Sequence, residues 1–175
     1  MPRLRESSLS SAASDMAEAF DVRVTFTASG PFGLRVRGRG KDLRCFADGK
    51  SLVFSVPLPG IETGISMRDG AMHDLLGTRR HPTVELRVPR ADVTIPSGKA
   101  SAEGEVVGRL TLRGKSAPIS VAYETKSSGD KLGVTGSMRI PVDKWGISLP
   151  QHMGFGLKSL VAAKVVFSVF AADID

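Results

Sequence analysis

The sequence predicts an all-β fold: a single antiparallel barrel of eight strands with one short helix. Three observations lead to this prediction. From residue 21 onward, apolar and polar side chains alternate with a period of two, which is typical of strands with one buried face. The 19 glycines and 10 prolines are spread along the 175 residues, as many short strands joined by turns require. Because almost every strand has one apolar face, these faces must share one interior, which an eight-stranded closure provides.

The first two predicted strands cover 22–27 and 32–37, with a turn at 29–31 between them. In both strands the apolar residues fall on alternate positions, so one face of each is apolar. Leu34 and Val36 lie on the apolar face of the second strand, and we expect both to point inward.

A strand pattern also surrounds Cys45, so the sequence contains eight or nine strands in all. Cys45 is the only cysteine, which excludes an intramolecular disulfide, and a packed small residue is the simplest interpretation. The next strand, 52–58, follows a turn at 47–50 and places Phe54 and Val56 inward.

The pattern changes once, over 67–76, where Met72, Leu75 and Leu76 recur at helical spacing. Gly77 then follows as a stop signal. We expect a short helix in this stretch, which plugs or flanks one end of the barrel.

Alternation resumes in five further strands, each with an apolar residue that we expect to face inward. These strands are 84–88 with Leu86, 105–114 with Leu112, 119–123 with Val121, 132–140 with Met138 and 161–169 with Phe167. Three small residues, Gly108, Gly136 and Ala163, share the inward parity. They fit either the bends of a coiled barrel or space that is left for a ligand.

No linker divides residues 21–175, so we expect one barrel domain, preceded by a flexible arm over 1–20. A short helix is expected over 14–20, capped by Ser14 or Asp15. The arm begins with basic residues but lacks the continuous apolar run of a secretory signal peptide. No later stretch is long and apolar enough to span a bilayer, so we expect no integral membrane association.

The chain is basic, with 24 Lys and Arg against 18 Asp and Glu and a formal net charge of +6. Most of the basic residues alternate with apolar ones, which favours a solvated strand face; attraction to an anionic surface or head group is the alternative. No aromatic residues suited to base stacking are interleaved with them, so we expect no nucleic-acid partner.

Four motifs in series resemble the YceI-like family. In its strand-to-helix signature, a Thr-Gly is followed by an Arg-Asp and a short helix, as in Thr63-Gly64 and Arg68-Asp69 here. The similar segments, in matching order between about residue 22 and residue 171, are 58–76, His81-Pro-Thr-Val-Glu-Leu86, Gly108-Arg-Leu-Thr-Leu-Arg-Gly114 with Pro118, and Asp143-Lys-Trp-Gly-Ile147.

This resemblance implies an extended lipocalin-like barrel that binds a polyisoprenoid or a similar amphiphile in its lumen. It also implies a periplasmic or secreted protein, whereas the chain as given shows no signal peptide, so its localisation stays open. We therefore expect non-catalytic binding, storage or transport of a long apolar molecule, such as a polyisoprenoid, a quinone or a similar lipid. The alternative is a structural or interaction barrel whose core is filled by its own side chains.

The candidate ligand-binding residues combine the inward apolar positions with two residues near the barrel ends. They are Leu34, Val36, Phe54, Val56, Arg68, Leu86, Leu112, Val121, Met138, Trp145 and Phe167. Arg68 either binds a polar head group or pairs with a carboxylate while Asp69 caps the helix. Trp145, the only tryptophan, either plugs the core or lines the mouth of the lumen.

The sequence favours no further chemistry. The histidines, His73, His81 and His152, match no metal-ligand spacing, and we expect no metal site. We find no nucleophile elbow, phosphate-binding loop or paired carboxylates, so we expect no catalytic residues and no cofactor. The expected partner is a long-chain isoprenoid or another amphiphilic lipid, and the sequence does not define the oligomeric state.

Overall fold

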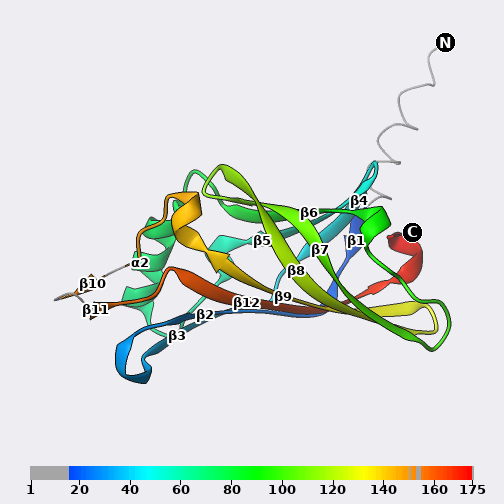
Figure 1. Ribbon diagram of the computed structural model, residues 1–175, viewed down its shortest axis with the longest axis horizontal. Helices are drawn as coiled ribbons and strands as arrows, with labels where there is room; N and C mark the ends of the chain where they lie inside the picture. Colours follow the sequence, from blue (N-terminus) through cyan, green and yellow to red (C-terminus); the bar gives the residue numbers. More distant parts are fainter. Residues whose placement is uncertain (1–15, 150, 153–154, 175) are drawn as a thin grey trace, which may run out of the picture.

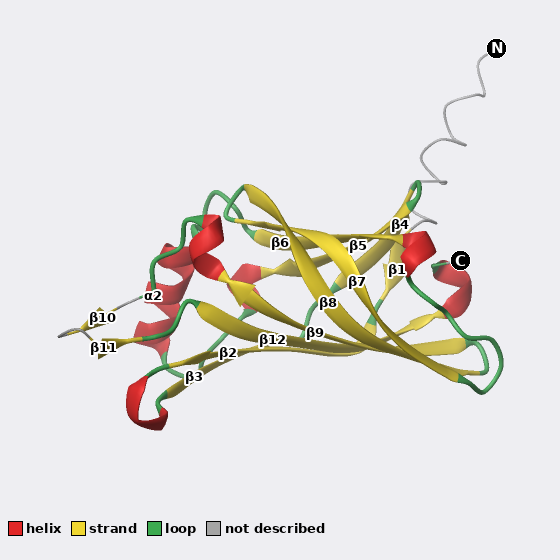
Figure 2. Cartoon of the chain, in the orientation of Figure 1, coloured by secondary structure: helices red, strands yellow, loops and turns green. Residues whose placement is uncertain are grey.

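The computed structural model describes residues 16–149, 151–152 and 155–174. One large antiparallel sheet curls around an apolar interior, and helix α2 lies at one end of the long axis, opposite the C-terminus (Figure 1). Strands dominate the fold, and the short helical turns lie at its two ends (Figure 2). The prediction of an all-β, antiparallel protein with one helix is confirmed for the described residues.

The strands of the large sheet are β1 (Met16–Glu18), β2 (Phe20–Ser29), β3 (Arg35–Gly40), β4 (Arg44–Asp48), β5 (Ser51–Pro57), β6 (Thr83–Pro89), β7 (Ser101–Leu112), β8 (Lys115–Ser128), β9 (Lys131–Pro141) and β12 (Leu160–Phe170). The other elements are the hairpin of β10 (Gln151–His152) and β11 (Phe155–Gly156), helix α2 (Ser66–Leu76), and the 3-10 turns η1 (Pro31–Gly33), η2 (Leu58–Gly60), η3 (Arg90–Asp92), η4 (Val142–Trp145) and η5 (Ala171–Asp173).

The hydrogen-bonded order of the large sheet is β1-β4-β5-β6-β7-β8-β9-β12-β2-β3. Ten described strands take part, nine of them five residues or longer, so the predicted number of eight is wrong. The outer strands β1 and β3 are not paired with each other, and the sheet is an open, curled half-barrel rather than a closed barrel. The two edges of the sheet nevertheless come close together. Strand β1 pairs with β4 at one edge and β2 pairs with β12 near the other, yet only Ala19 separates β1 from β2 in the chain.

The predicted helix over 14–20 is wrong in its described part, because β1 and the start of β2 occupy 16–20. Residues 16–19, Met-Ala-Glu-Ala, are good helix formers, but pairing with β4 and β12 gives the backbone hydrogen-bond partners that override this local propensity. Asp21, near the start of β2, has a φ of 52°, and the register between β2 and β12 shifts at this point, between Arg23 and Phe20. Residues 1–15 of the expected flexible arm lie outside the described residues.

Helix α2 confirms the prediction made for 67–76, with one additional residue at its start. Gly77 ends it in the left-handed conformation at φ 65°, which glycine adopts without steric cost, and its N–H donates to the carbonyls at the helix end. Met72, Leu75 and Leu76 pack against the buried core. The helix therefore covers one end of the curled sheet.

Candidate ligand-binding lumen

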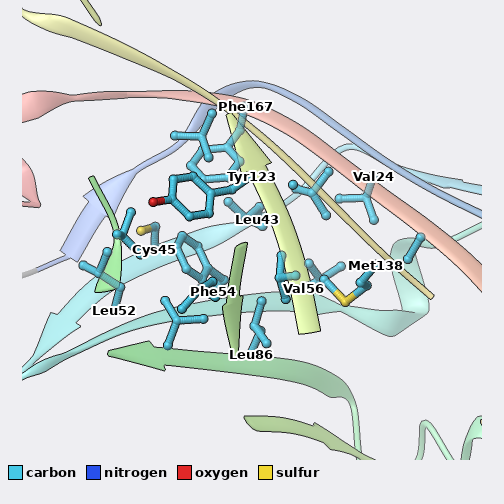
Figure 3. Close-up of a pocket in the computed structure, with 18 of the residues that line it drawn as sticks. Val24, Leu43, Cys45, Leu52, Phe54, Val56, Leu86, Tyr123, Met138 and Phe167 are labelled. Atoms are coloured by element: carbon cyan, nitrogen blue, oxygen red, sulfur yellow. The ribbon is translucent and has the colours of Figure 1, made fainter. Parts of the chain in front are cut away.

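The curled sheet encloses an apolar cavity of about 150 Å³, lined mainly by residues from β4 to β9 and from β12. Figure 3 shows Phe54, Val56, Leu86, Met138 and Phe167 gathered around it. An engineered apolar cavity of about 150 Å³ in another protein stays dry and binds benzene. The lumen therefore has free room for an apolar group about as large as one aromatic ring.

Six of the predicted site residues line this cavity: Phe54, Val56, Leu86, Val121, Met138 and Phe167. In the strands that carry these six residues, the apolar positions face the cavity as alternation predicts, and the register joins these faces into one wall. The rings of Phe54 and Phe167 meet with their centroids 5.8 Å apart. Because β5 and β12 are not neighbours in the sheet, this contact crosses the lumen and limits its width.

Two residues of the cavity wall, Tyr123 and Thr125, have a side-chain oxygen atom. Both hydroxyls form hydrogen bonds within the protein. The hydroxyl of Tyr123 accepts from the N–H of Thr94 at 3.0 Å and donates to the carbonyl of Asp92 at 3.4 Å. The hydroxyl of Thr125 donates to the carbonyl of Thr94 at 2.8 Å. Polar groups already satisfied in this way leave a wall that suits an apolar chain and disfavours a buried polar head group.

The wall also contains the Cys45 thiol, which is 1% exposed. Burial raises the pKa of this thiol to about 12, so Cys45 is protonated at neutral pH and acts as a packed apolar residue. In the described part of the chain, no group of three or more His, Cys, Asp or Glu side chains is placed to hold a metal ion. The same residues include no helix with the length and apolar character needed to cross a bilayer.

Leu34 and Val36, which we expected to point inward, do not line the cavity. Leu34 precedes β3 at the end of the β2–β3 hairpin and is 49% exposed. Val36 lies on the inward parity and is half-buried, but it pairs with Ala28 outside the cavity wall. Alternation identifies the inward face of a strand, but it does not show how far the strand extends beyond the enclosed interior.

Leu112 and Trp145 are buried but do not line the cavity, so their predicted contact with a ligand is not supported. Trp145 is 2% exposed, and its indole N–H donates to the carbonyl of Leu110 at 2.9 Å. Of the two alternatives for Trp145, the structure shows the core plug. It lies in η4, which follows β9 at the helix end of the sheet.

Arg68 is exposed on α2 and is not part of the cavity wall. The expected cap by Asp69 is wrong, because the helix begins after Ile65 without a side-chain cap. Asp69 instead accepts hydrogen bonds from the N–H and the hydroxyl of Thr63, at 2.6 Å and 2.5 Å. These bonds from Thr63 are the main reason why the pKa of Asp69 lies below its usual value. Asp69 thus ties the connection that precedes the helix to the helix itself.

The small residues predicted to face inward differ in role. A Cβ added at Gly136 would find its nearest neighbour, a methyl of Val121, 3.8 Å away, and Ala163 also lines the cavity. A Cβ at Gly108 would come within 2.8 Å of a methyl of Val88 and 3.0 Å of a backbone oxygen of β6. Gly136 and Ala163 therefore provide cavity space, whereas Gly108 allows β7 to approach β6 closely.

Sequence reasoning missed the wall residues that come from loops and turns: Leu43, Val93, Ile95 and Ile174. Val93 and Ile95 flank Thr94 in a strand-like alternation, a signal that could have found them. Leu43 and Ile174 are single apolar residues between polar ones, and only the fold shows that they are buried.

The fold is similar to that of several solved structures. A polyisoprenoid binding domain from Saccharophagus degradans matches with a TM-score of 0.73 and 16% identity, over 90% of this chain and 98% of that one. BcnA from Burkholderia cenocepacia matches with a TM-score of 0.66 and 14% identity, over 84% and 95% of the two chains. A YceI protein from Campylobacter jejuni matches with a TM-score of 0.50 and 18% identity, over 64% and 71%. At these identities the likeness establishes a shared fold.

Among the curated proteins compared with the chain, none matches it. The model of the YceI-like domain matches residues 6–171, which is nearly the whole chain. This match covers all four motifs quoted above and every strand of the large sheet. The chain therefore belongs to the family of YceI-like domains.

Proposed function

We propose that the protein binds a long apolar molecule of the polyisoprenoid or a similar lipid class without transforming it, and that the apolar chain lies in the lumen. The cavity wall carries this proposal, because its side-chain hydroxyls are already hydrogen-bonded within the protein. Such a wall selects a ligand by apolar contact alone. The likeness to a polyisoprenoid binding domain supports the ligand class.

The apolar contact supplies enough free energy for useful affinity. Each isoprene unit that leaves water contributes up to about 4 kcal/mol, at about 0.8 kcal/mol per buried carbon group. Three buried units thus provide up to about 12 kcal/mol, from which association removes at least about 4 kcal/mol. At most about 8 kcal/mol remains, which corresponds to a dissociation constant of about 1 μM at the tightest.

Three isoprene units are larger than the free cavity. A cavity of about this volume in another protein accepts one benzene ring, with six carbon atoms, whereas three isoprene units contain fifteen. Binding therefore requires wall side chains to move aside. Met138, with its flexible unbranched side chain, and the Phe54–Phe167 pair across the lumen are the residues that we expect to move.

A titration with prenols of increasing length tests the proposal. Prenols with two, three and four isoprene units share one hydroxyl head, so differences in affinity report the apolar chain alone. We expect the affinity to rise with each added unit until the lumen is full, and then to level off. If no prenol of any length binds to the folded protein, the proposal fails and the alternative of a self-filled barrel stands.

A further inference from the structure

The outer surface of four neighbouring strands, β3, β2, β12 and β9, is basic throughout the half of the sheet nearer to α2. In the segments 23–29, 35–39, 135–139 and 160–166, the outward-facing positions contain six cations and no acidic residue. These cations are exposed, and we call them the basic face: Arg23, Arg35, Arg37, Arg39, Arg139 and Lys164.

The register of the sheet brings these cations together. Thr25 pairs with Arg39 on one side and with Lys164 on the other. In the next row, Arg37 and Arg139 are separated by small side chains of β2 and β12. Strands lie about 4.8 Å apart, so the face is about 15 Å wide. Within the described residues, none of its six cations takes part in an ion pair. The acidic residues nearest to the face lie at its margins: Glu62 pairs with Arg39 through the backbone, and Glu124 pairs with Thr135.

An apolar tip adjoins the basic face at the end of the β2–β3 hairpin. Phe32 is 95% exposed there and Leu34 is 49% exposed. Phe32 has a φ of 58°, which is uncommon for a bulky residue, and the N–H of Gly30 closes the turn on the carbonyl of Leu34 at 2.8 Å. The N-terminal end of α2 lies at the same end of the molecule and adds Ile65 and Met67, which are 50% and 87% exposed (Figure 1).

We propose that the basic face and the hairpin tip dock onto the surface of an anionic phospholipid bilayer. The guanidinium and ammonium groups bind the phosphates of the head groups, and Phe32 and Leu34 enter the apolar layer beneath them. A nucleic acid also presents phosphates, but it offers no apolar layer for the exposed aliphatic and aromatic side chains at this end. The inference goes beyond the proposed function and does not depend on which molecule occupies the lumen.

Vesicle binding by the full chain tests this inference. The parent chain is mixed with vesicles of phosphatidylcholine alone, and with vesicles of phosphatidylcholine and phosphatidylglycerol, and the bound fraction is measured by co-sedimentation. One variant reverses three cations of the basic face: Arg35→Glu, Arg37→Glu and Lys164→Glu. The matched control reverses three exposed lysines outside the basic face: Lys50→Glu in the turn between β4 and β5, Lys99→Glu just before β7, and Lys126→Glu, which pairs with Ser101 at the start of β7. Each reversal lowers the charge by two, so both variants go from a formal +6 to zero.

We expect the parent to bind the anionic vesicles and not those of phosphatidylcholine alone. One cation near an anionic membrane strengthens binding roughly fivefold, so the basic-face variant should bind on the order of 100-fold more weakly or worse. The control variant should lose far less, and thermal melting should show that both variants are folded. Equal losses in the two variants would show a response to net charge alone and would overturn the docking surface.

A second measurement follows the hairpin tip. In a Phe32→Trp variant, the new indole should shift its emission to the blue on anionic vesicles, while the buried Trp145 gives a constant background. Phe32→Asn, which suits the positive φ, should weaken vesicle binding about fivefold to tenfold. Absence of both effects would overturn the proposal. The proposal would also be overturned if the chain bound a short DNA duplex more tightly than the anionic vesicles, and if reversal of the three cations weakened that DNA binding to the same extent.

Discussion

Replacing Gly136 by leucine distinguishes between two alternatives for the interior: a lumen with space for a ligand, and a core that its own side chains already fill. Gly136 lies in the middle of β9 and has no positive φ, so its backbone accepts a side chain. Its added Cβ meets only a methyl of Val121, at 3.8 Å, and the rest of the side chain extends into the cavity. The leucine side chain has four carbon atoms, fewer than the six of the benzene ring that a cavity of about 150 Å³ accepts in another protein, so it fits the space available.

The sign of the stability change follows from this space. Removing a glycine from a strand is worth about 0.5–1 kcal/mol, and burying a leucine side chain adds about 1.5–3 kcal/mol when it fits well. Fixing the leucine side chain in one rotamer costs about 0.5–1 kcal/mol, so we expect Gly136→Leu to be about 1–3 kcal/mol more stable than the parent. For a chain of this length, each kcal/mol raises the melting temperature by roughly 2–4 °C. In a core that is already full, the same change would cost about 1–3 kcal/mol.

Melting temperature and titration with a four-unit prenol are then measured on the same preparations. We expect Gly136→Leu to melt higher and to bind the prenol at least tenfold more weakly, because the leucine occupies the space of the ligand. Gly108→Leu is the matched control: its Cβ would contact Val88 at 2.8 Å, so it should lower the melting temperature sharply. A Gly136→Leu variant that melts well below the parent, or that binds the prenol as tightly, would refute the reasoning.

Three further predictions concern other residues. Trp145→Phe removes the donor to the carbonyl of Leu110, so the free energy of unfolding in a denaturant titration should fall by about 1–3 kcal/mol. The affinity for prenols should stay unchanged, because Trp145 lies outside the cavity wall. A loss of affinity without a loss of stability would place Trp145 at the ligand. At pH values above the usual carboxyl pKa of about 3.9, Asp69→Ala should melt at a lower temperature than the parent. The folded pKa of Asp69 is lowered, so the stabilisation by Thr63 is present at neutral pH and is lost as the pH falls through that folded pKa; a difference that persists in acid would contradict this. Cys45, with a thiol pKa of about 12, should resist iodoacetamide at pH 8 in the folded protein and react in guanidinium chloride, as mass spectrometry can show; rapid labelling of the native chain would contradict its burial.

Alternation along the strands was enough to predict which face of the main wall strands points into the lumen. Phe54, Leu86 and Phe167 come from strands far apart in the sequence, yet each was assigned to the correct face, because a period of two fixes the face of every residue in a strand. The helix could also be predicted, because its spacing and the following Gly77 are local signals.

The remaining features depend on contacts between distant segments. Strand β1 has only three residues and is stabilised by its pairing with β4, so no local sequence pattern could predict it. Leu34 falls on an apolar position of the alternation, but it lies at the end of the β2–β3 hairpin, which extends beyond the enclosed interior. The different roles of Gly108 and Gly136 follow from the distance to neighbouring strands, which alternation does not contain.

Native mass spectrometry tests the central claim most directly. The chain is expressed in bacteria, purified without detergent and measured first intact and then after denaturation. Binding in the lumen predicts that the native protein carries one lipid molecule per chain, which denaturation releases, and that Gly136→Leu carries markedly less of it. A native spectrum that shows the bare chain alone, from folded protein that also takes up no added polyprenol, would contradict the account.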